Sequence, residues 1–273
     1  MKIWLNDRIC DSQEIEMDSD GWPVGSGVFE TIRTENGEVF ELARHMRRAA
    51  TAARNFEIKL PGEDQIRDAI AALLTAEPHH LGRLRLLFSK KWFVAVHQSY
   101  VEITEPAKLT LIDESRLVDP IAFKTFPYGH RTGLLQLAQR DGFDEIICVN
   151  ESGEITEGAV SNFLFLIDEK WVTTPLSAGV LPGVQRAIVI ERCGVTVQSL
   201  TRNDMERVES AIVISSLKIG LAVASIDNRD LIFDEQCRSF LDQIRAQTHS
   251  HSVGQQPVPA LDHRRWSRRK RCR

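Results

Sequence analysis

The chain contains 273 residues, of which 42% are hydrophobic and 26% carry charge, and its formal net charge is −4 at pH 7. A chain of this length and composition can bury a sizeable core, as one large domain or two smaller ones. Because acidic residues outnumber basic ones, the surface as a whole is not expected to attract polyanions, and nucleic-acid binding is not predicted.

The basic residues are unevenly distributed and concentrate at the C-terminus. Residues 251–273 contain seven Arg or Lys side chains against the single acid Asp262, together with Pro, Gln, Ser and His. This composition predicts a disordered tail. Two interpretations of its charge stay open, a solvated or non-native end and an arm that binds anions, and the first is favoured.

The cysteines argue against a metal knuckle or a disulfide framework, because no two of them are close in sequence. They are Cys10, Cys148, Cys193, Cys237 and Cys272. A reducing cytosol fits this pattern. The residues after Met1 contain no apolar core of signal-peptide length, and no run approaches the length of a membrane span. We therefore expect a cytoplasmic protein without a metal site and without a membrane partner.

The first hundred residues predict a mixture of strands and helices. Periodicity and turn residues predict strands over 1–9, 28–33, 39–42, 83–89, 92–98 and 100–104, and helices over 43–56 and 65–75. Asn36 and Gly37 mark a type I′ hairpin turn, because this pair supplies the positive φ angles that the turn requires. The first helix places Met46, Ala49 and Ala53 at helical spacing, so we expect that face to pack inward.

Residues 105–120 carry the weakest pattern, and we place the domain boundary there. Beyond it, the sequence predicts strands over 121–125, 145–149, 162–167, 195–200, 211–215 and 222–226, and helices over 132–139, 182–193, 203–208 and 234–245. Because strands and helices mix without a strict βαβ repeat, the fold class is α+β, or mixed α/β. The expected organisation is an N-terminal α/β domain over 1–110, a linker over 111–121, a C-terminal α/β domain over 122–250 and the basic tail over 251–273.

Lys124 is the first candidate for chemistry. It lies in the largely apolar segment 121–126, next to a predicted strand. Burial of an amine disfavours its charged form, lowers its pKa and frees the lone pair that a Schiff-base lysine needs. Taken alone, a lysine beside a strand is more often an edge charge, so this interpretation depends on the neighbouring motifs.

Two further segments could supply the partners of a pyridoxal 5'-phosphate (PLP) cofactor. Glu157 lies in a turn, and a carboxylate at the pyridine nitrogen of PLP keeps that nitrogen protonated and makes the ring an electron sink. The segment 181–186 opens a helix through Pro182 and Gly183, and its unpaired N–H groups could receive a phosphate. Each signal is weak alone, because turn glutamates and Pro-Gly turns are common.

Taken together, these motifs resemble those of the fold-type IV PLP enzymes. This class IV aminotransferase group includes branched-chain aminotransferases, D-amino acid aminotransferases and aminodeoxychorismate lyases. The resemblance covers about residues 1–245. Its six motifs are GSGVFETIR at 25–33, RR at 47–48, KT at 124–125, DE at 144–145, TEGAVSN at 156–162 and LPGVQR at 181–186.

The resemblance implies a two-domain fold, like that of D-amino acid aminotransferases, with PLP between the domains, and it implies a homodimer. It assigns Lys124 to the Schiff base with PLP, Glu157 to the pyridine nitrogen and Arg48 to the phosphate. The remaining cofactor-binding candidates are the backbone N–H groups of Val184 and Gln185, and Ser216.

The reaction is harder to assign from the resemblance. Leu217 stands where the aminotransferases have a threonine that helps to hold the phosphate, as it does in the aminodeoxychorismate lyases. The segment 86–92 lacks the Arg-Gly loop that lyases and D-amino acid aminotransferases usually carry, so the residues that bind the substrate carboxylate stay unassigned. The candidates for substrate contact are Phe29, Tyr128, His130 and Arg131.

Three functions stay open at this point. The favoured one is a lyase of the folate pathway that converts 4-amino-4-deoxychorismate to 4-aminobenzoate and pyruvate, with Lys124 taking a proton from the substrate. The first alternative is a class IV aminotransferase that acts on branched-chain or D-amino acids. The second is a non-catalytic paralogue of the same fold, against which the intact Lys124 and Glu157 argue.

Overall fold

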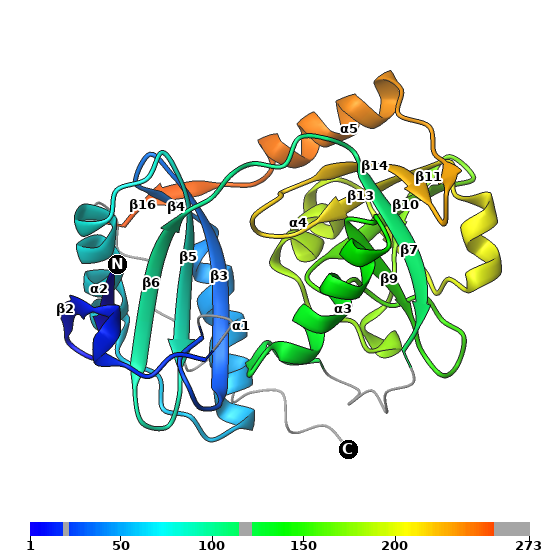
Figure 1. Ribbon diagram of the computed structural model, residues 1–273. Helices are drawn as coiled ribbons and strands as arrows, with labels where there is room; N and C mark the ends of the chain where they lie inside the picture. The colour runs from blue at the N-terminus through cyan, green and yellow to red at the C-terminus, as the bar shows by residue number, and fades with distance from the viewer. Residues whose placement is uncertain (19–21, 115–121, 254–273) are drawn as a thin grey trace, which may run out of the picture.

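The first lobe of the protein is built on a sheet that two helices cover. The computed structural model describes residues 1–18, 22–114 and 122–253. Within them, the first sheet has the strand order β16 (Ser250–Ser252), β4 (Glu38–Phe40), β3 (Gly27–Glu35), β5 (Leu81–Phe88), β6 (Phe93–Ser99), β1 (Lys2–Leu5) and β2 (Arg8–Asp11), with β8 (Thr125–Phe126) paired to β3. The helices α1 (Leu42–Asn55) and α2 (Glu63–Ala76) cover one face of it (Figure 1).

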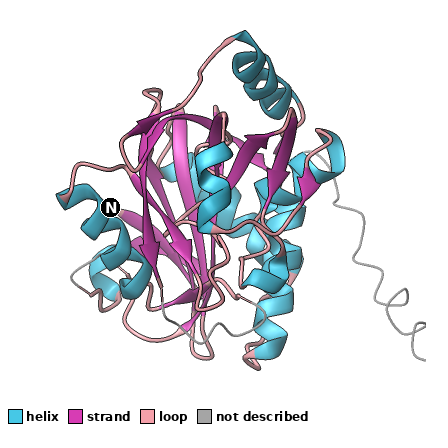
Figure 2. Cartoon of the chain, turned by 90° about the vertical axis from the view of Figure 1, so that its right-hand side faces the viewer, coloured by secondary structure: helices cyan, strands magenta, loops and turns pink. Residues whose placement is uncertain are grey.

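The second lobe is built on a second sheet. Its strand order is β12 (Thr196–Val197), β11 (Lys170–Thr173), β10 (Asn162–Ile167), β13 (Ser210–Ile214), β14 (Leu221–Ile226), β7 (Ala107–Asp113) and β9 (Glu145–Val149), with β15 (Arg229–Asp230) paired to β14. The helices of this lobe are α3 (Gly129–Arg140), α4 (Val184–Arg192) and α5 (Glu235–Ala246). Short 3-10 helices lie at Ser12–Glu14, Leu176–Ala178 and Arg202–Arg207. Figure 2 shows helices in front of and on both sides of the strands. No helix in the described part of the chain is long and apolar enough to cross a membrane.

Alternation along β3 determines which face of the first sheet meets the second lobe. Val28 and Ile32 are fully buried and share one hydrophobic cluster with α1, α2 and Leu84 of β5. Because successive side chains of a strand point to opposite faces, Phe29 and Thr31 point the other way. They line a cavity to which the second lobe also contributes walls. β3 therefore connects the core of the first lobe to the space between the lobes.

The mixed α/β fold class is confirmed, and several local predictions are corrected. One strand over 1–9 is wrong, because the chain turns at Asn6, whose φ is 56°, and forms the antiparallel pair β1 and β2. The strand over 100–104 is also wrong, since this segment joins the two sheets and Val101 is 83% exposed. The strands expected over 121–125 and 195–200 shorten to β8 and β12, and residue 121 lies outside the described residues.

The chain passes between the lobes earlier than the sequence suggested. The linker expected over 111–121 starts inside β7, which pairs with β14 and β9 in the second sheet. The crossing segment is 100–106. β8 and β16 return to the first sheet by pairing with β3 and β4, so the two lobes are not consecutive stretches of chain. The tail expected from residue 251 begins inside β16, and residues 254–273 lie outside the described residues.

Arg33 joins the two lobes. Its side chain is 2% exposed, and its Nη1 donates a 2.6 Å hydrogen bond to the carbonyl of Leu217, in the turn after β13. Its Nε donates to Glu35 at 2.7 Å and its Nη2 donates to Glu102 at 3.1 Å. A buried guanidinium needs such partners, because an uncompensated charge in the interior costs several kcal/mol.

We expect Arg33→Met to lower the free energy of unfolding by about 3 kcal/mol, because it leaves the Leu217 carbonyl without its donor and separates the lobes. The matched control is Arg202→Met, which removes an exposed ion pair with Asp113 and should cost less than about 1 kcal/mol. Urea denaturation of both variants measures the difference. Equal losses would contradict the role of Arg33 as the tie between the lobes.

Candidate active site

Lys124 lies between the two lobes, directly before β8. Its carbonyl accepts a 3.0 Å hydrogen bond from the backbone N–H of Phe29, which fixes the chain where the side chain enters the cavity. Its Nζ lies 4.5 Å from the ring centroid of Phe29 and 5.1 Å from that of Tyr128. The cavity has a volume of about 490 Å³, and both lobes contribute to its walls.

The surroundings of Lys124 lower its pKa to about 8. Burial is the largest cause, because removal of water disfavours the ammonium form. The positive charge of Arg48 acts in the same direction, while Glu30 and Glu157 oppose it. A substantial fraction of this amine is therefore neutral near pH 8, which suits a nucleophile or a proton acceptor.

Arg48 lies on the inward face of α1, where Glu30 of β3 holds it. The Nε of Arg48 donates to Oε1 of Glu30 at 2.8 Å, and its Nη2 donates to Oε2 at 2.5 Å. Its Nη1 donates to the carbonyl of Pro182 at 3.2 Å. Burial by itself would raise the pKa of Glu30, but Arg48 and His45 outweigh it and lower that pKa to about 2. A guanidinium has five N–H donors, so two stay available to an anion in the cavity.

The N-terminus of α4 borders the same cavity. Val184 and Gln185 line it, and the preceding Gly183 provides no side-chain cap for the first N–H groups of the helix. Such N–H groups and the helix dipole favour an anion. A Cβ atom at Gly183 would lie 1.9 Å from Oδ1 of Asn162, so only glycine fits there. The side-chain amide of Gln185 donates to Thr248 at 2.8 Å, which leaves its backbone N–H as the group offered to the cavity.

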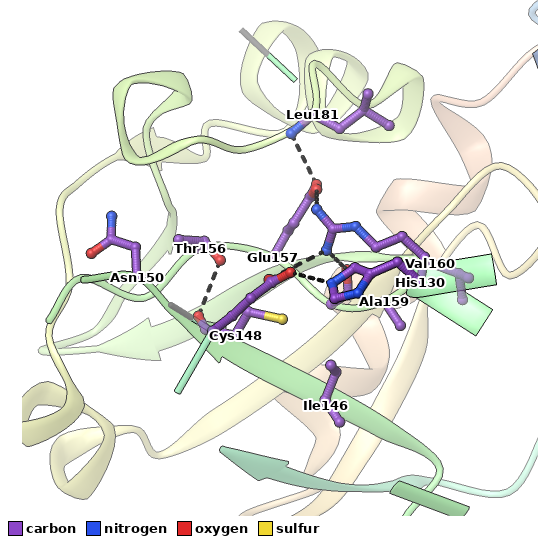
Figure 3. Close-up of polar contacts among 12 residues, drawn as sticks. His130, Ile146, Cys148, Asn150, Thr156, Glu157, Ala159, Val160 and Leu181 are labelled. Atoms are coloured by element: carbon purple, nitrogen blue, oxygen red, sulfur yellow. Dashed lines mark hydrogen bonds and ion pairs between the residues drawn. The ribbon is translucent and has the colours of Figure 1, made fainter. Parts of the chain in front are cut away.

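Glu157 is buried where the turn after β9 borders the cavity. Its Oε2 accepts hydrogen bonds from the N–H of Leu181 at 2.9 Å (Figure 3) and from Nδ2 of Asn162 at 3.1 Å. Its Oε1 accepts from Nη2 of Arg131 at 2.9 Å. Burial raises the pKa of Glu157, and the charge of Arg131 opposes that effect. Because a carboxylate has about four acceptor sites, one site stays open for a further donor.

The structure brings most of the candidate residues to this cavity. Those that line it are Phe29, Arg48, Lys124, Tyr128, Glu157, Val184, Gln185 and Ser216. His130, predicted as a substrate contact, lies outside this lining, and its Nε2 is 2.8 Å from Oε1 of Glu114. Arg131 binds Glu157 and is also absent from the lining. Tyr128 donates from its hydroxyl to the carbonyl of Ala159 at 3.2 Å.

Sequence reasoning missed Arg83 and Arg85 of β5, which line the cavity. The guanidinium of Arg85 lies 4.3 Å from the ring centroid of Trp22. The Nε atoms of both arginines are buried and have no hydrogen-bond partner among the described residues. Burial lowers the pKa of Arg85 to about 10, and the charge of Arg83 adds to that effect. The alternation of arginine and leucine over 82–87 was the available signal, since it places both arginines on one face.

Sequence reasoning also missed the partners of Arg48. Glu30 is fully buried, and its Oε2 lies 2.6 Å from Nδ1 of His45 on α1. The available signal was the position of Glu30 between Val28 and Ile32 on the apolar side of β3, because a carboxylate there needs a cation.

The donors and acceptors around the cavity fit PLP. Two free N–H groups of Arg48 and the uncapped start of α4 suit a phosphate. The amine of Lys124 suits an aldehyde, and the open acceptor site of Glu157 suits a protonated ring nitrogen. Within the described residues, no group of three His, Cys, Asp or Glu side chains is placed to hold a metal ion.

We expect an acylating reagent to modify Lys124 of the cofactor-free protein with a midpoint near pH 8, because the amine reacts only when neutral. Ordinary exposed lysines reach the same midpoint at a pH of about 10.4. Peptide mass spectrometry over a pH series measures the midpoint, and Lys124→Met identifies the labelled peptide. In Arg48→Gln the midpoint should rise, since a nearby positive charge is gone. A midpoint above pH 10 in the unmodified chain would contradict the burial of this amine.

Comparison with known proteins places the chain in a family. Residues 27–226 match the family described as amino-transferase class IV. The chain is 23% identical over 256 residues to D-alanine aminotransferase of Bacillus licheniformis, with 85% of this chain and 90% of that protein covered. It is 26% identical over 214 residues to aminodeoxychorismate lyase of Bacillus subtilis, with 69% and 72% covered. A hypothetical aminotransferase from Mycobacterium tuberculosis, solved in its PLP-bound form, has a TM-score of 0.78 at 18% identity over 90% of this chain and 98% of that one. Because the family match spans most of its length, the chain belongs to the class IV aminotransferases, a family of PLP-dependent enzymes.

Proposed function

We propose that the protein is a PLP-dependent lyase that converts 4-amino-4-deoxychorismate to 4-aminobenzoate and pyruvate. The observation that carries this proposal is the pair Arg83 and Arg85, which line the same cavity as Lys124. The proposed substrate has one amino group and two carboxylates. Two guanidinium groups beside one amine match that distribution of charge.

The burial of Arg83 and Arg85 favours a ligand with two anionic groups. Burial lowers the pKa of both side chains, because a guanidinium out of water is costly without a counterion. Nη2 of Arg83 donates to Gln98 at 2.8 Å, which is a neutral partner. A carboxylate accepts two parallel hydrogen bonds from one guanidinium. An amino acid with a single carboxylate would leave the other arginine unpaired, so the pair selects a dianion.

The residues around the cavity have distinct tasks in the proposed reaction. PLP, when bound, supplies an electron sink for the electrons of a broken C–H bond. Arg48 and the N-terminus of α4 bind its phosphate, and Glu157 keeps its ring nitrogen protonated. Nζ of Lys124 takes the proton from the substrate carbon that carries the amino group, the neighbouring C–O bond breaks, and the enolpyruvate that leaves takes up a proton to become pyruvate. Phe29 and Tyr128 border the ammonium and help to exclude water from it.

A second candidate is an aminotransferase that acts on branched-chain or D-amino acids. The relatives support it as strongly as they support the lyase. The match to D-alanine aminotransferase of Bacillus licheniformis covers 85% of this chain, and the match to aminodeoxychorismate lyase of Bacillus subtilis covers 69%. In that reaction Lys124 would move a proton between the substrate carbon and the cofactor. Under either proposal the substrate is a small amino compound and the enzyme is a homodimer, as the family resemblance implies, and the scattered cysteines suit a location in the cytoplasm.

We expect the purified holoenzyme to release pyruvate from 4-amino-4-deoxychorismate faster than it forms glutamate from 2-oxoglutarate with branched-chain or D-amino acids. A lactate dehydrogenase coupled assay measures pyruvate, and chromatography measures glutamate. Glutamate formation without pyruvate release would overturn the lyase proposal and support the aminotransferase.

The same assay tests the arginine pair. Arg85→Gln should raise the KM for 4-amino-4-deoxychorismate by about one to two orders of magnitude, because a charge-assisted hydrogen bond is lost. The matched control is Arg67→Gln, which changes a partly buried arginine of α2 that does not line the cavity. An unchanged KM in Arg85→Gln would show that the substrate carboxylates bind elsewhere.

A further inference from the structure

Arg131 of α3 lies between two carboxylates. Its Nη2 donates to Oε1 of Glu157 at 2.9 Å, while its Nη1 donates to the carbonyl of Gly158 at 3.2 Å and lies 3.9 Å from Oε2 of Glu114. The side chain is 22% exposed. Burial by itself would lower the pKa of Arg131, but Glu157 and Glu114 outweigh it and raise that pKa. One guanidinium therefore compensates two acids, of which only Glu157 lines the cavity.

Glu114 is held in place from several sides. It follows β7, and its backbone N–H donates to the carbonyl of Val149 at 2.8 Å. Its Oε1 lies 2.8 Å from Nε2 of His130, the residue before Arg131 on α3. Burial would raise the pKa of Glu114, but the contacts with His130 and Arg131 outweigh it and lower that pKa, so the carboxyl is ionised at neutral pH. Figure 3 shows His130 beside this network and Glu157 at its centre.

The geometry limits how Arg131 binds Glu157. A guanidinium can place two parallel N–H groups on one carboxylate. Because Oε2 of Glu157 already accepts from Leu181 and Asn162, such a fork would have to place both N–H groups on Oε1, and all of the about four acceptor sites would then be filled. Here Nη1 of Arg131 donates to the carbonyl of Gly158 and is attracted by the charge of Glu114 at 3.9 Å, so Glu157 receives a single N–H from Arg131.

We propose that Glu114, clamped by His130, is a positioning residue that keeps Arg131 from forming a fork on Glu157 and so leaves one acceptor site of Glu157 for the ring nitrogen of PLP. This inference rests on the proposed function, which places Glu157 at that nitrogen. Glu114 and His130 line no part of the cavity and act only through Arg131.

The neutral amide in Glu114→Gln tests the proposal, since it keeps the size of the side chain and removes its charge. Nη1 of Arg131 then keeps its hydrogen bond to Gly158 but loses the charge that attracts it away from Glu157. We expect the dissociation constant of PLP to rise about tenfold. The analogue in which CH replaces the ring nitrogen cannot donate to Glu157, so its dissociation constant should not change.

Two controls separate positioning from a general loss of structure. Glu41→Gln changes another partly buried carboxylate shared by two arginines, Arg44 and Arg192, and should leave both dissociation constants unchanged. Glu114→Asp keeps the charge and should restore part of the preference for PLP over the analogue. Equilibrium dialysis of the cofactor-free variants with PLP and with the analogue measures all of these constants.

The outcomes distinguish the positioning role of Glu114 from the proposed placement of Glu157 at the ring nitrogen of PLP. Weaker binding of PLP alone in Glu114→Gln supports the positioning role. Suppose that Glu157→Gln still weakens PLP selectively. If Glu114→Gln then weakens PLP and the analogue equally, or weakens neither, the positioning role of Glu114 is overturned. If Glu157→Gln also fails to distinguish PLP from the analogue, then the placement of Glu157 at the ring nitrogen is wrong, and both proposals are overturned.

Discussion

Glu30 of β3 and Arg48 of α1 form a buried ion pair on which the geometry of the cavity depends. The two N–H contacts of 2.8 and 2.5 Å fix the guanidinium plane, and Nδ1 of His45 lies 2.6 Å from the same carboxylate. Removal of either partner would leave a charge uncompensated in the interior, which is typically far more costly than the pair is worth. The pair therefore binds helix to sheet and directs the remaining donors of Arg48, whose charge helps to lower the pKa of Lys124.

Charge in the cavity is arranged for an anionic ligand. Its cationic side chains are Arg48, Arg83, Arg85, Lys124 and Lys218, whereas Glu157 is its acidic one. The net charge of the whole chain is −4, so the excess of positive charge in the cavity is a property of this site and not of the chain as a whole. A phosphate and one or two carboxylates would compensate these cations. The same ligand would replace the water that buried guanidinium and ammonium groups have lost.

The parts of the site that the sequence predicted are those encoded by short motifs. Lys124, Glu157 and the segment 181–186 each carry their chemistry within a few residues, and all three reach the cavity. Arg83 and Arg85 show only their alternation with leucine, and Glu114 shows no local signal of function. Their roles depend on contacts with β3, α3 and the second lobe, which only the folded chain brings together.

The fold likewise contains elements that their own sequence predicts and elements that form only through contact with distant parts of the chain. Most of the helices and long strands follow from periodicity, which is a property of the segment itself. The segment 100–104 alternates like a strand, yet no strand pairs with it because it spans the gap between two sheets. Conversely, β8 and β16 are too short to be recognised alone, and they become strands because β3 and β4 offer unpaired edges.

The dissociation constant of PLP in Arg48→Ala, compared with Arg47→Ala, tests most directly whether this cavity holds the cofactor. Arg48 lines the cavity, whereas Arg47 is the neighbouring residue of α1 and is exposed to solvent. The account predicts that Arg48→Ala weakens PLP by about one to two orders of magnitude and that Arg47→Ala has little effect. An equal or larger loss in Arg47→Ala would contradict it, because the phosphate would then bind another face of α1.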